Sequence, residues 1–202
     1  MSFLIKDFLT LFVVIDPIGL LPLYMLLVSK YPSEEQSRIA SKAVLVAALI
    51  LLVFAFAGTW LLHYLGISME AFQVAAGILL LKIAIDMVFA HLERETPEEE
   101  KEAQLRNDIS IFPLAVPLLA GPGSFASILI LSSETDIYPY DTLVVLTVAA
   151  IVLLITYLLF RLSEPLSKIL GQTGINVVTR IFGILLTALA IQYIADGSTV
   201  LL

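Results

Sequence analysis

The feature that most constrains this chain is a series of six long apolar stretches separated by short polar segments. A helix crosses a bilayer core of about 30 Å with roughly 20 apolar residues. Of the 202 residues, 59% are hydrophobic and 14% charged, whereas soluble domains carry about 45–50% apolar and about 25% charged residues. The sequence therefore predicts an all-α, polytopic membrane protein with six transmembrane helices. The expected spans are 4–28, 39–62, 69–90, 109–131, 142–160 and 177–195.

Positive charges divide unevenly between the two ends of these spans. If the spans alternate in direction, only Lys6 among the flanking basic residues lies on one side. The other side carries Lys30, Arg38, Lys42, Arg94, Lys101, Arg106, Arg161 and Lys168. Because loops rich in Lys and Arg stay in the cytoplasm, we expect a protein of the cell inner (plasma) membrane with both termini outside. The net charge of −7 is concentrated in segment 93–108, which we interpret as a solvated acidic loop.

The chain also contains an internal repeat. An offset of 106 places segment 77–80 on 183–186, both Gly-Ile-Leu-Leu, and an offset of 105 places Pro17 on Pro122 and Gly66 on Gly171. Three spans in each half make the second half enter the membrane in the opposite sense, which is an inverted repeat of the kind found in many secondary transporters. We therefore expect a first repeat at 1–92, an acidic cytoplasmic linker at 93–108 and a second, inverted repeat at 109–202.

The first stretch is interrupted near its midpoint by Asp16-Pro17-Ile18-Gly19. A charged side chain at the bilayer centre costs about 2.5–3.5 kcal/mol and is by default a functional candidate. Proline breaks the preceding helix, and Asp followed by Pro is also a common way to begin a new one. The sequence therefore predicts that the first transmembrane helix is broken at mid-membrane.

The fourth stretch carries a second interruption, Gly121-Pro122-Gly123-Ser124, at the matching midpoint. In inverted halves, two half-helix N-termini would meet at the midplane, and their free N–H groups and partial positive charge suit a carboxylate. The alternative is that these residues only kink helices and allow close packing, since Gly and Pro are common in membrane spans. The candidate substrate-binding residues are Asp16, Pro17, Ile18, Gly19, Gly121, Pro122, Gly123 and Ser124.

A further pair of charges lies in the third stretch, where Lys82 and Asp86 are one helical turn apart. They can form an ion pair, which is either structural or part of ion coupling; Asp16 and Asp86 are the coupling candidates. The chain has no cysteine, and its two histidines lack a partner at metal-ligand spacing. It also lacks a phosphate loop and a basic nucleic-acid patch, so we expect no metal, no cofactor and no nucleic-acid partner.

The two interrupted stretches resemble the MarC family of bacterial and archaeal membrane proteins, also called the small neutral amino acid transporter family. The resemblance is carried by segment 16–22, Asp-Pro-Ile-Gly-Leu-Leu-Pro, and segment 115–124, Ala-Val-Pro-Leu-Leu-Ala-Gly-Pro-Gly-Ser. Length, six spans, outward termini and the charged central loop also agree, so the resemblance covers the whole chain. It implies transport of glycine, alanine and similar amino acids, driven by a gradient of H⁺ or Na⁺.

We therefore expect a secondary transporter of small neutral amino acids that works by alternating access in the lipid bilayer, and not an enzyme. Two other classes stay open. An intramembrane enzyme acting on a lipid or peptide would use Asp16 and Asp86 as an acid/base pair, although their expected depths in the membrane differ. A structural or regulatory membrane subunit would need a partner.

Overall fold

The computed structural model describes residues 2–89, 108–133 and 140–201, and every regular element within these ranges is helical. The all-α class is therefore confirmed. The acidic linker expected at 93–108 lies outside the described residues except for Asp108. In chain order the helices are α1 (Ser2–Ile15), α2 (Leu21–Val28), α3 (Ser33–Tyr64), α4 (Met69–Phe89), the π-helical η1 (Ser110–Leu119), α6 (Pro122–Ser133), α7 (Tyr140–Arg161) and α8 (Ser163–Leu201).

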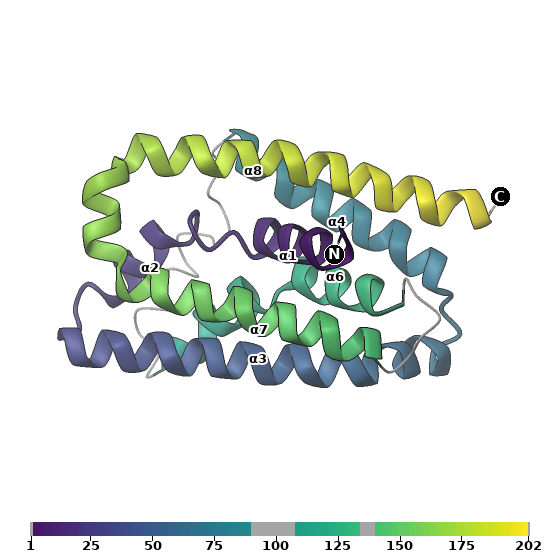
Figure 1. Ribbon diagram of the computed structural model, residues 1–202, viewed down its shortest axis with the longest axis horizontal. Coiled ribbons are helices and arrows are strands. Elements are labelled where there is room, and N and C mark those ends of the chain that lie inside the picture. The colour runs from purple at the N-terminus through teal and green to yellow at the C-terminus, as the bar shows by residue number, and fades with distance from the viewer. Residues whose placement is uncertain (1, 90–107, 134–139, 202) are drawn as a thin grey trace.

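Four long helices, α3, α4, α7 and α8, run along the length of the molecule (Figure 1). Each is long and apolar enough to cross a membrane, and η1 with α6 makes a fifth candidate if the two are counted as one span bent by 51°. The outward face of α3 presents large apolar side chains, among them Leu45, Leu49, Val53 and Trp60. Such a surface is too apolar for a soluble monomer, and it suits contact with lipid.

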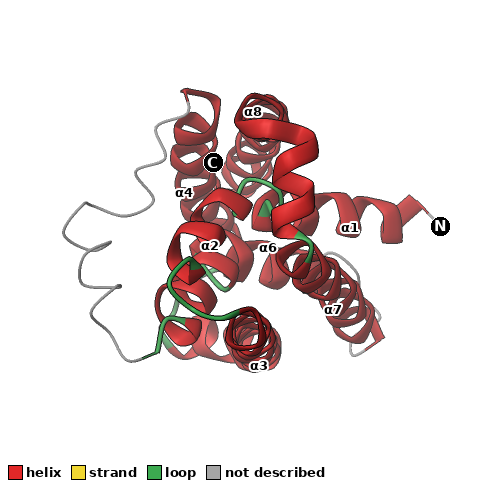
Figure 2. Cartoon of the chain, turned by 90° about the vertical axis from the view of Figure 1, so that its left-hand side faces the viewer, coloured by secondary structure: helices red, strands yellow, loops and turns green. Residues whose placement is uncertain are grey.

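Helix α6 forms the centre of the molecule (Figure 2), and its residues from Ala126 to Ser132 are all buried. It packs against α1, α3, α4 and α7. A helix that is apolar on all sides is stable only when other protein surrounds it. The start of α6, which coincides with the second interruption in the sequence, is thereby placed among the surrounding helices.

The first interruption is present, but α1 and α2 do not form one straight span. Helix α1 lies across the direction of the four long helices, being foreshortened in Figure 1 and seen from the side in Figure 2. Helix α2 is held by Tyr24, whose ring stacks on Phe160 of α7 at 4.2 Å between centroids. The hydroxyl of Tyr24 also donates a hydrogen bond to the carbonyl of Gln36 at 3.0 Å. The described residues thus hold four or five candidate spans, and the expected number was six.

Two segments differ from the expected helices for local reasons. In η1, Phe112 and Val116 have extended backbone angles, because each precedes a proline, which disfavours the helical region for the residue before it. The link expected between the last two spans is instead helical from Ser163 onward, because Pro165 falls in the first turn, where its missing N–H costs little. A positive φ of 62° at Gly171 then changes the direction of α8.

The most extensive helix contact joins α4 to α8 and depends on small residues. A Cβ added at Gly77 would lie 2.7 Å from the carbonyl oxygen of Ala190, and one added at Gly183 would lie 3.0 Å from that of Ala84. The two backbones are therefore in direct contact. This is the usual way in which membrane helices associate without a hydrophobic driving force.

Candidate functional site

Asp16 joins the end of α1 to the start of a new helical turn. Its φ of 48° is left-handed, a conformation that Asp and Asn adopt more readily than other residues with a side chain. Its N–H donates to the carbonyl of Phe12 at 3.0 Å, and its Oδ1 accepts a hydrogen bond from the Gly19 N–H at 3.0 Å. With Pro17 directly after it, the Asp16 carboxyl caps the turn that precedes α2. It does not cap α2 itself, because the N-cap position of α2 is Leu20, which makes no side-chain capping bond.

The Asp16 carboxyl is enclosed by its surroundings and is 0% exposed. A Cβ added at Gly19 would lie 2.0 Å from Asp16 Oδ2 and 2.7 Å from Thr179 Oγ1 on α8. Only glycine therefore leaves room for this carboxyl at position 19. The Asp16 side chain, which the sequence analysis gave as a candidate substrate contact, is therefore enclosed next to Gly19 and Thr179.

The second interruption has a different construction. Helix α6 begins at Pro122, and its first-turn bond runs from the Phe125 N–H to the carbonyl of Gly121 at 3.0 Å. The Ser124 hydroxyl donates to the carbonyl of Leu119 at 2.8 Å, so it does not cap the first-turn amides. The N–H groups of Gly123 and Ser124 belong to that first turn, for which a helix provides no backbone acceptor.

Gly121 is required at this turn because the chain folds back on itself. A Cβ at this position would lie 2.2 Å from the carbonyl oxygen of Pro117. Since the obstructing atom belongs to the backbone, a side-chain rotation cannot relieve the contact. The close approach at Gly121 is therefore between two parts of the chain itself.

A cavity of about 240 Å³ lies at the start of α6. One wall is the turn from Gly121 to Ser124, and a second, on α4, carries Lys82 and Asp86. The remaining wall is apolar and consists of Val14, Leu79, Ile83, Pro117 and Leu118. The cavity is therefore lined by the first turn of α6, an ion pair and an apolar surface.

The ion pair in this cavity joins Lys82 Nζ to Asp86 Oδ2 at 3.0 Å, with the two side chains 75% and 32% exposed. The sequence had indicated the pair, but not its place beside Gly121. Asp86 thus lies with the candidate residues of the second interruption. The candidate residues of the first interruption, from Asp16 to Gly19, do not line this cavity. The nearest part of the chain that does is Val14, at the end of α1.

The apolar wall was not identified from the sequence. Leu79 and Ile83 flank Lys82 at helical spacing on α4, so the face that carries the ion pair could have indicated them. No comparable sequence signal marks Val14 or Leu118, because their place depends on how α1 and η1 pack against other helices.

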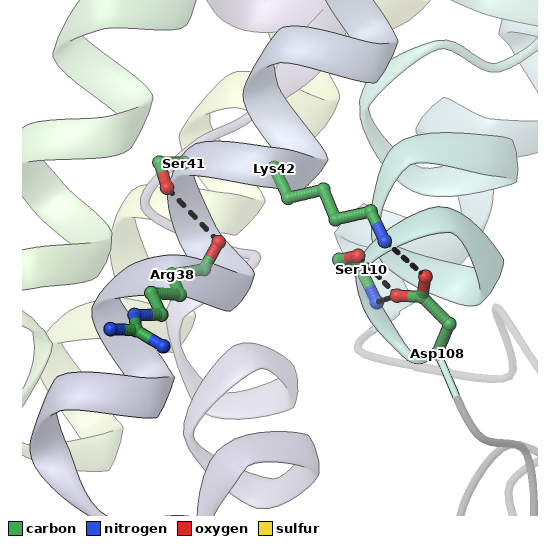
Figure 3. A network of polar contacts seen from close by, with 5 residues as sticks. All are labelled: Arg38, Ser41, Lys42, Asp108 and Ser110. Carbon is green, nitrogen blue, oxygen red and sulfur yellow. Dashed lines mark hydrogen bonds and ion pairs between the residues drawn. The ribbon is translucent and has the colours of Figure 1, made fainter.

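A second polar cluster lies where the chain enters η1 (Figure 3). The Lys42 ammonium on α3 forms an ion pair with Asp108, whose other oxygen accepts hydrogen bonds from the N–H and hydroxyl of Ser110. These bonds from Lys42 and Ser110 lower the pKa of the Asp108 carboxyl below its usual value. A cavity of about 500 Å³ adjoins the cluster. It is also lined by Tyr31, Glu34, Glu35 and Arg38, and Figure 3 shows the Arg38 side chain directed away from the ion pair.

The Lys42–Asp108 pair is expected to stabilise the protein only above acidic pH. Because the pKa of Asp108 is lowered on folding, its contribution is present above the unfolded value of about 3.9 and is lost as the pH falls through the folded value. Asp108→Asn should cost below about 1 kcal/mol at neutral pH, since the pair is partly solvated. Thermal midpoints of the purified protein across this pH range check the expectation. The difference between wild type and variant should shrink on acidification, and a difference that grows there would contradict it.

The whole chain, residues 1–202, matches the model of the MarC family of integral membrane proteins. A UPF0056 membrane protein of Methanocaldococcus jannaschii is 39% identical over 198 residues, covering 98% of this chain and 96% of the relative. UPF0056 membrane proteins of Escherichia coli and Bacillus subtilis are 35% and 34% identical, covering 95% and 97% of this chain and 90% and 94% of theirs. No solved structure matches. The apolar helices described above and these full-length similarities show that the chain belongs to the MarC family of multi-pass integral membrane proteins.

Proposed function

We propose that this protein is a secondary transporter of small neutral amino acids, of the glycine and alanine type, that works by alternating access and is coupled to H⁺ or Na⁺. The observation that carries the proposal is the cavity at the start of α6. The ion pair of α4, the first-turn residues of α6 and an apolar wall line one small space.

The chemistry of the cavity matches a small zwitterion. The amides of Gly123 and Ser124 lie at a helix N-terminus, which favours a carboxylate through its N–H groups and its dipole. The wall of Val14, Leu79 and Ile83 suits a hydrogen atom or a methyl group as the side chain. The volume of about 240 Å³ is below the range of about 300–1,000 Å³ found for drug-sized ligands, which favours a small solute.

The contacts between α4 and α8 support an inverted repeat. Under the offset of 106, Gly77 corresponds to Gly183 and Ala84 to Ala190. Gly77 approaches Ala190, and Gly183 approaches Ala84, so each contact is the counterpart of the other. This reciprocity is what a two-fold axis between equivalent surfaces produces. Gly66 and Gly171, which the offset of 105 aligns, also share a positive φ, of 70° and 62°.

Such an axis gives a physical route to alternating access. Two halves of similar sequence can exchange conformations, and the exchange opens a central site first to one side of the membrane and then to the other. In this proposal the side rich in Lys and Arg is cytoplasmic. Asp16, the fully buried carboxyl of the first interruption, remains a candidate for binding the coupling ion, together with Asp86.

Counterflow in proteoliposomes tests the proposal. Vesicles containing the purified protein and loaded with unlabelled alanine are expected to accumulate radiolabelled glycine, and vesicles without protein should not. Gly123→Leu should abolish exchange, because the Cβ at this position would lie 3.1 Å from Val14 Cγ1 and 3.6 Å from Ile83 Cδ1, so a large side chain would displace residues that line the cavity. Gly123→Ala adds a methyl that meets side-chain atoms and no backbone, Leu80 Cδ2 at 3.0 Å and Val14 Cγ1 at 3.1 Å, and should retain part of the activity.

Ala75→Leu is the matched control, because it adds side-chain volume to an exposed position of α4 away from the cavity. It should exchange glycine like the wild type. If the wild type exchanges no small neutral amino acid while a lipid or peptide is turned over, the transporter proposal is wrong and the enzyme alternative takes its place.

A further inference from the structure

We propose that Asp86 binds the ammonium group of the zwitterionic substrate, and that Lys82 takes its place on Asp86 when the cavity is empty. This inference rests on the proposed function and assigns to the ion pair a role beyond packing. Lys82 would act as a built-in substitute for the substrate ammonium and would be displaced when the substrate binds.

The position of the pair supports this role. Both side chains line the same cavity and belong to α4, one of the candidate membrane spans. Charged residues within a membrane span are costly, face cavities or the protein interior, and mark substrate or ion pathways. The group that contacts Asp86 is a primary ammonium, which is the same chemical group that an amino acid would bring.

Access distinguishes Asp86 from Asp16 as the ammonium site. Asp16 is 0% exposed, and one of its oxygens already accepts the Gly19 N–H. A ligand could reach its other oxygen only if the residues that enclose the carboxyl moved. Asp86 is about one-third exposed and already lies on the cavity wall, so an incoming ammonium can reach it without a change in the backbone.

The exchange of one ammonium for another leaves Asp86 paired throughout. The substrate also brings a carboxylate, so the site gains one negative charge when Lys82 moves away, and the proposal places that carboxylate at the N-terminus of α6, where the helix dipole favours it. The displaced Lys82 is three-quarters exposed, and its flexible stem lets the ammonium move toward water or lipid headgroups. Because the substrate ammonium takes over the contact that Lys82 gives up on Asp86, the displacement replaces one charge-assisted contact by another of the same kind.

The test measures glycine binding to purified protein by thermal shift, since a ligand that binds only the folded state raises its apparent stability. Lys82→Met removes the competing ammonium and should tighten glycine binding about twofold or more. Asp86→Asn should weaken it about tenfold or more, because a charge-assisted contact is lost. Glycolate, which has a hydroxyl where glycine has its ammonium, should bind poorly to the wild type.

Two further variants test whether a change in glycine binding comes from the Lys82–Asp86 pair or from any loss of a charged side chain. Lys168→Met removes the lysine of another pair with the same spacing, Lys168 with Glu164 at 2.7 Å, which does not line the cavity; glycine binding should be unchanged. The double variant Lys82→Met/Asp86→Asn removes both charges and leaves no unpaired one. It should keep its fold and bind glycine as weakly as Asp86→Asn.

The outcomes distinguish this inference from the proposed function. If the wild type binds and exchanges glycine while Asp86→Asn does so equally well, Asp86 is not the ammonium site and the transporter proposal stands. Weaker binding in Lys82→Met would show that Lys82 holds the substrate carboxylate, and would also overturn the inference. If the wild type neither binds nor exchanges any small neutral amino acid, the proposed function itself fails.

Discussion

Gly77→Leu is expected to lower the free energy of unfolding by about 1–3 kcal/mol or more, the range seen when extra groups are forced into a well-packed interior. A Cβ at this position would lie 2.6 Å from Ile194 Cγ1 and 2.7 Å from the carbonyl oxygen of Ala190. Because the carbonyl belongs to the backbone of α8, the contact is relieved only if the two helices separate. Thermal unfolding of the purified protein in detergent measures the loss.

The structure provides both a control and a counterpart for this variant. Ala75→Leu adds a large side chain to an exposed position of the same helix and should leave the unfolding midpoint close to that of the wild type. Gly183→Leu should cost about as much as Gly77→Leu, because its Cβ would lie 2.9 Å from Met87 Cβ and 3.0 Å from the carbonyl oxygen of Ala84. A Gly77→Leu variant as stable as Ala75→Leu would contradict the direct backbone contact between α4 and α8.

The interruptions could be predicted from the sequence because their cause is local. Proline at position 17 prevents continuation of the preceding helix whatever surrounds it, and the structure ends α1 at Ile15. Gly121-Pro122 acts in the same way before α6, which begins at Pro122. Element type and helix breaks follow from neighbouring residues, so one sequence is sufficient to find them.

The cavity could not be assembled from the sequence because it depends on contacts between distant segments. Val14 lies on α1, Asp86 on α4 and Gly121 in the link between η1 and α6. Hydrophobic periodicity does not specify which of these segments become neighbours. The direction of α1 has the same origin. Periodicity indicates a helix of suitable length, but not that α1 crosses the long helices instead of running beside them (Figure 2).

The role of Asp16 as a cap can be separated from the role of its charge. Asp16→Ala is expected to lower the free energy of unfolding by about 2 kcal/mol or more. The left-handed backbone conformation is unfavourable for alanine, and alanine provides no acceptor for the Gly19 N–H. Asp16→Asn should remain close to the wild type in stability, since asparagine tolerates positive φ and its side-chain oxygen can accept the same N–H. Unfolding measurements on the three proteins check this order, and equal losses in both variants would show that the buried charge is needed for stability.

A double-mutant cycle with Gly19 tests the same arrangement from the opposite side. In the wild-type background, Gly19→Ala brings a methyl to 2.0 Å from Asp16 Oδ2, so either the carboxyl or the turn must move, with loss of the cap. In the Asp16→Ala background the obstructing oxygen is absent, and only Thr179 Oγ1 at 2.7 Å remains close. Gly19→Ala should therefore be markedly less destabilising in the second background, because residues in direct contact have non-additive effects. Additive losses would mean that Asp16 and Gly19 do not share the close contact on which the construction of the first interruption depends.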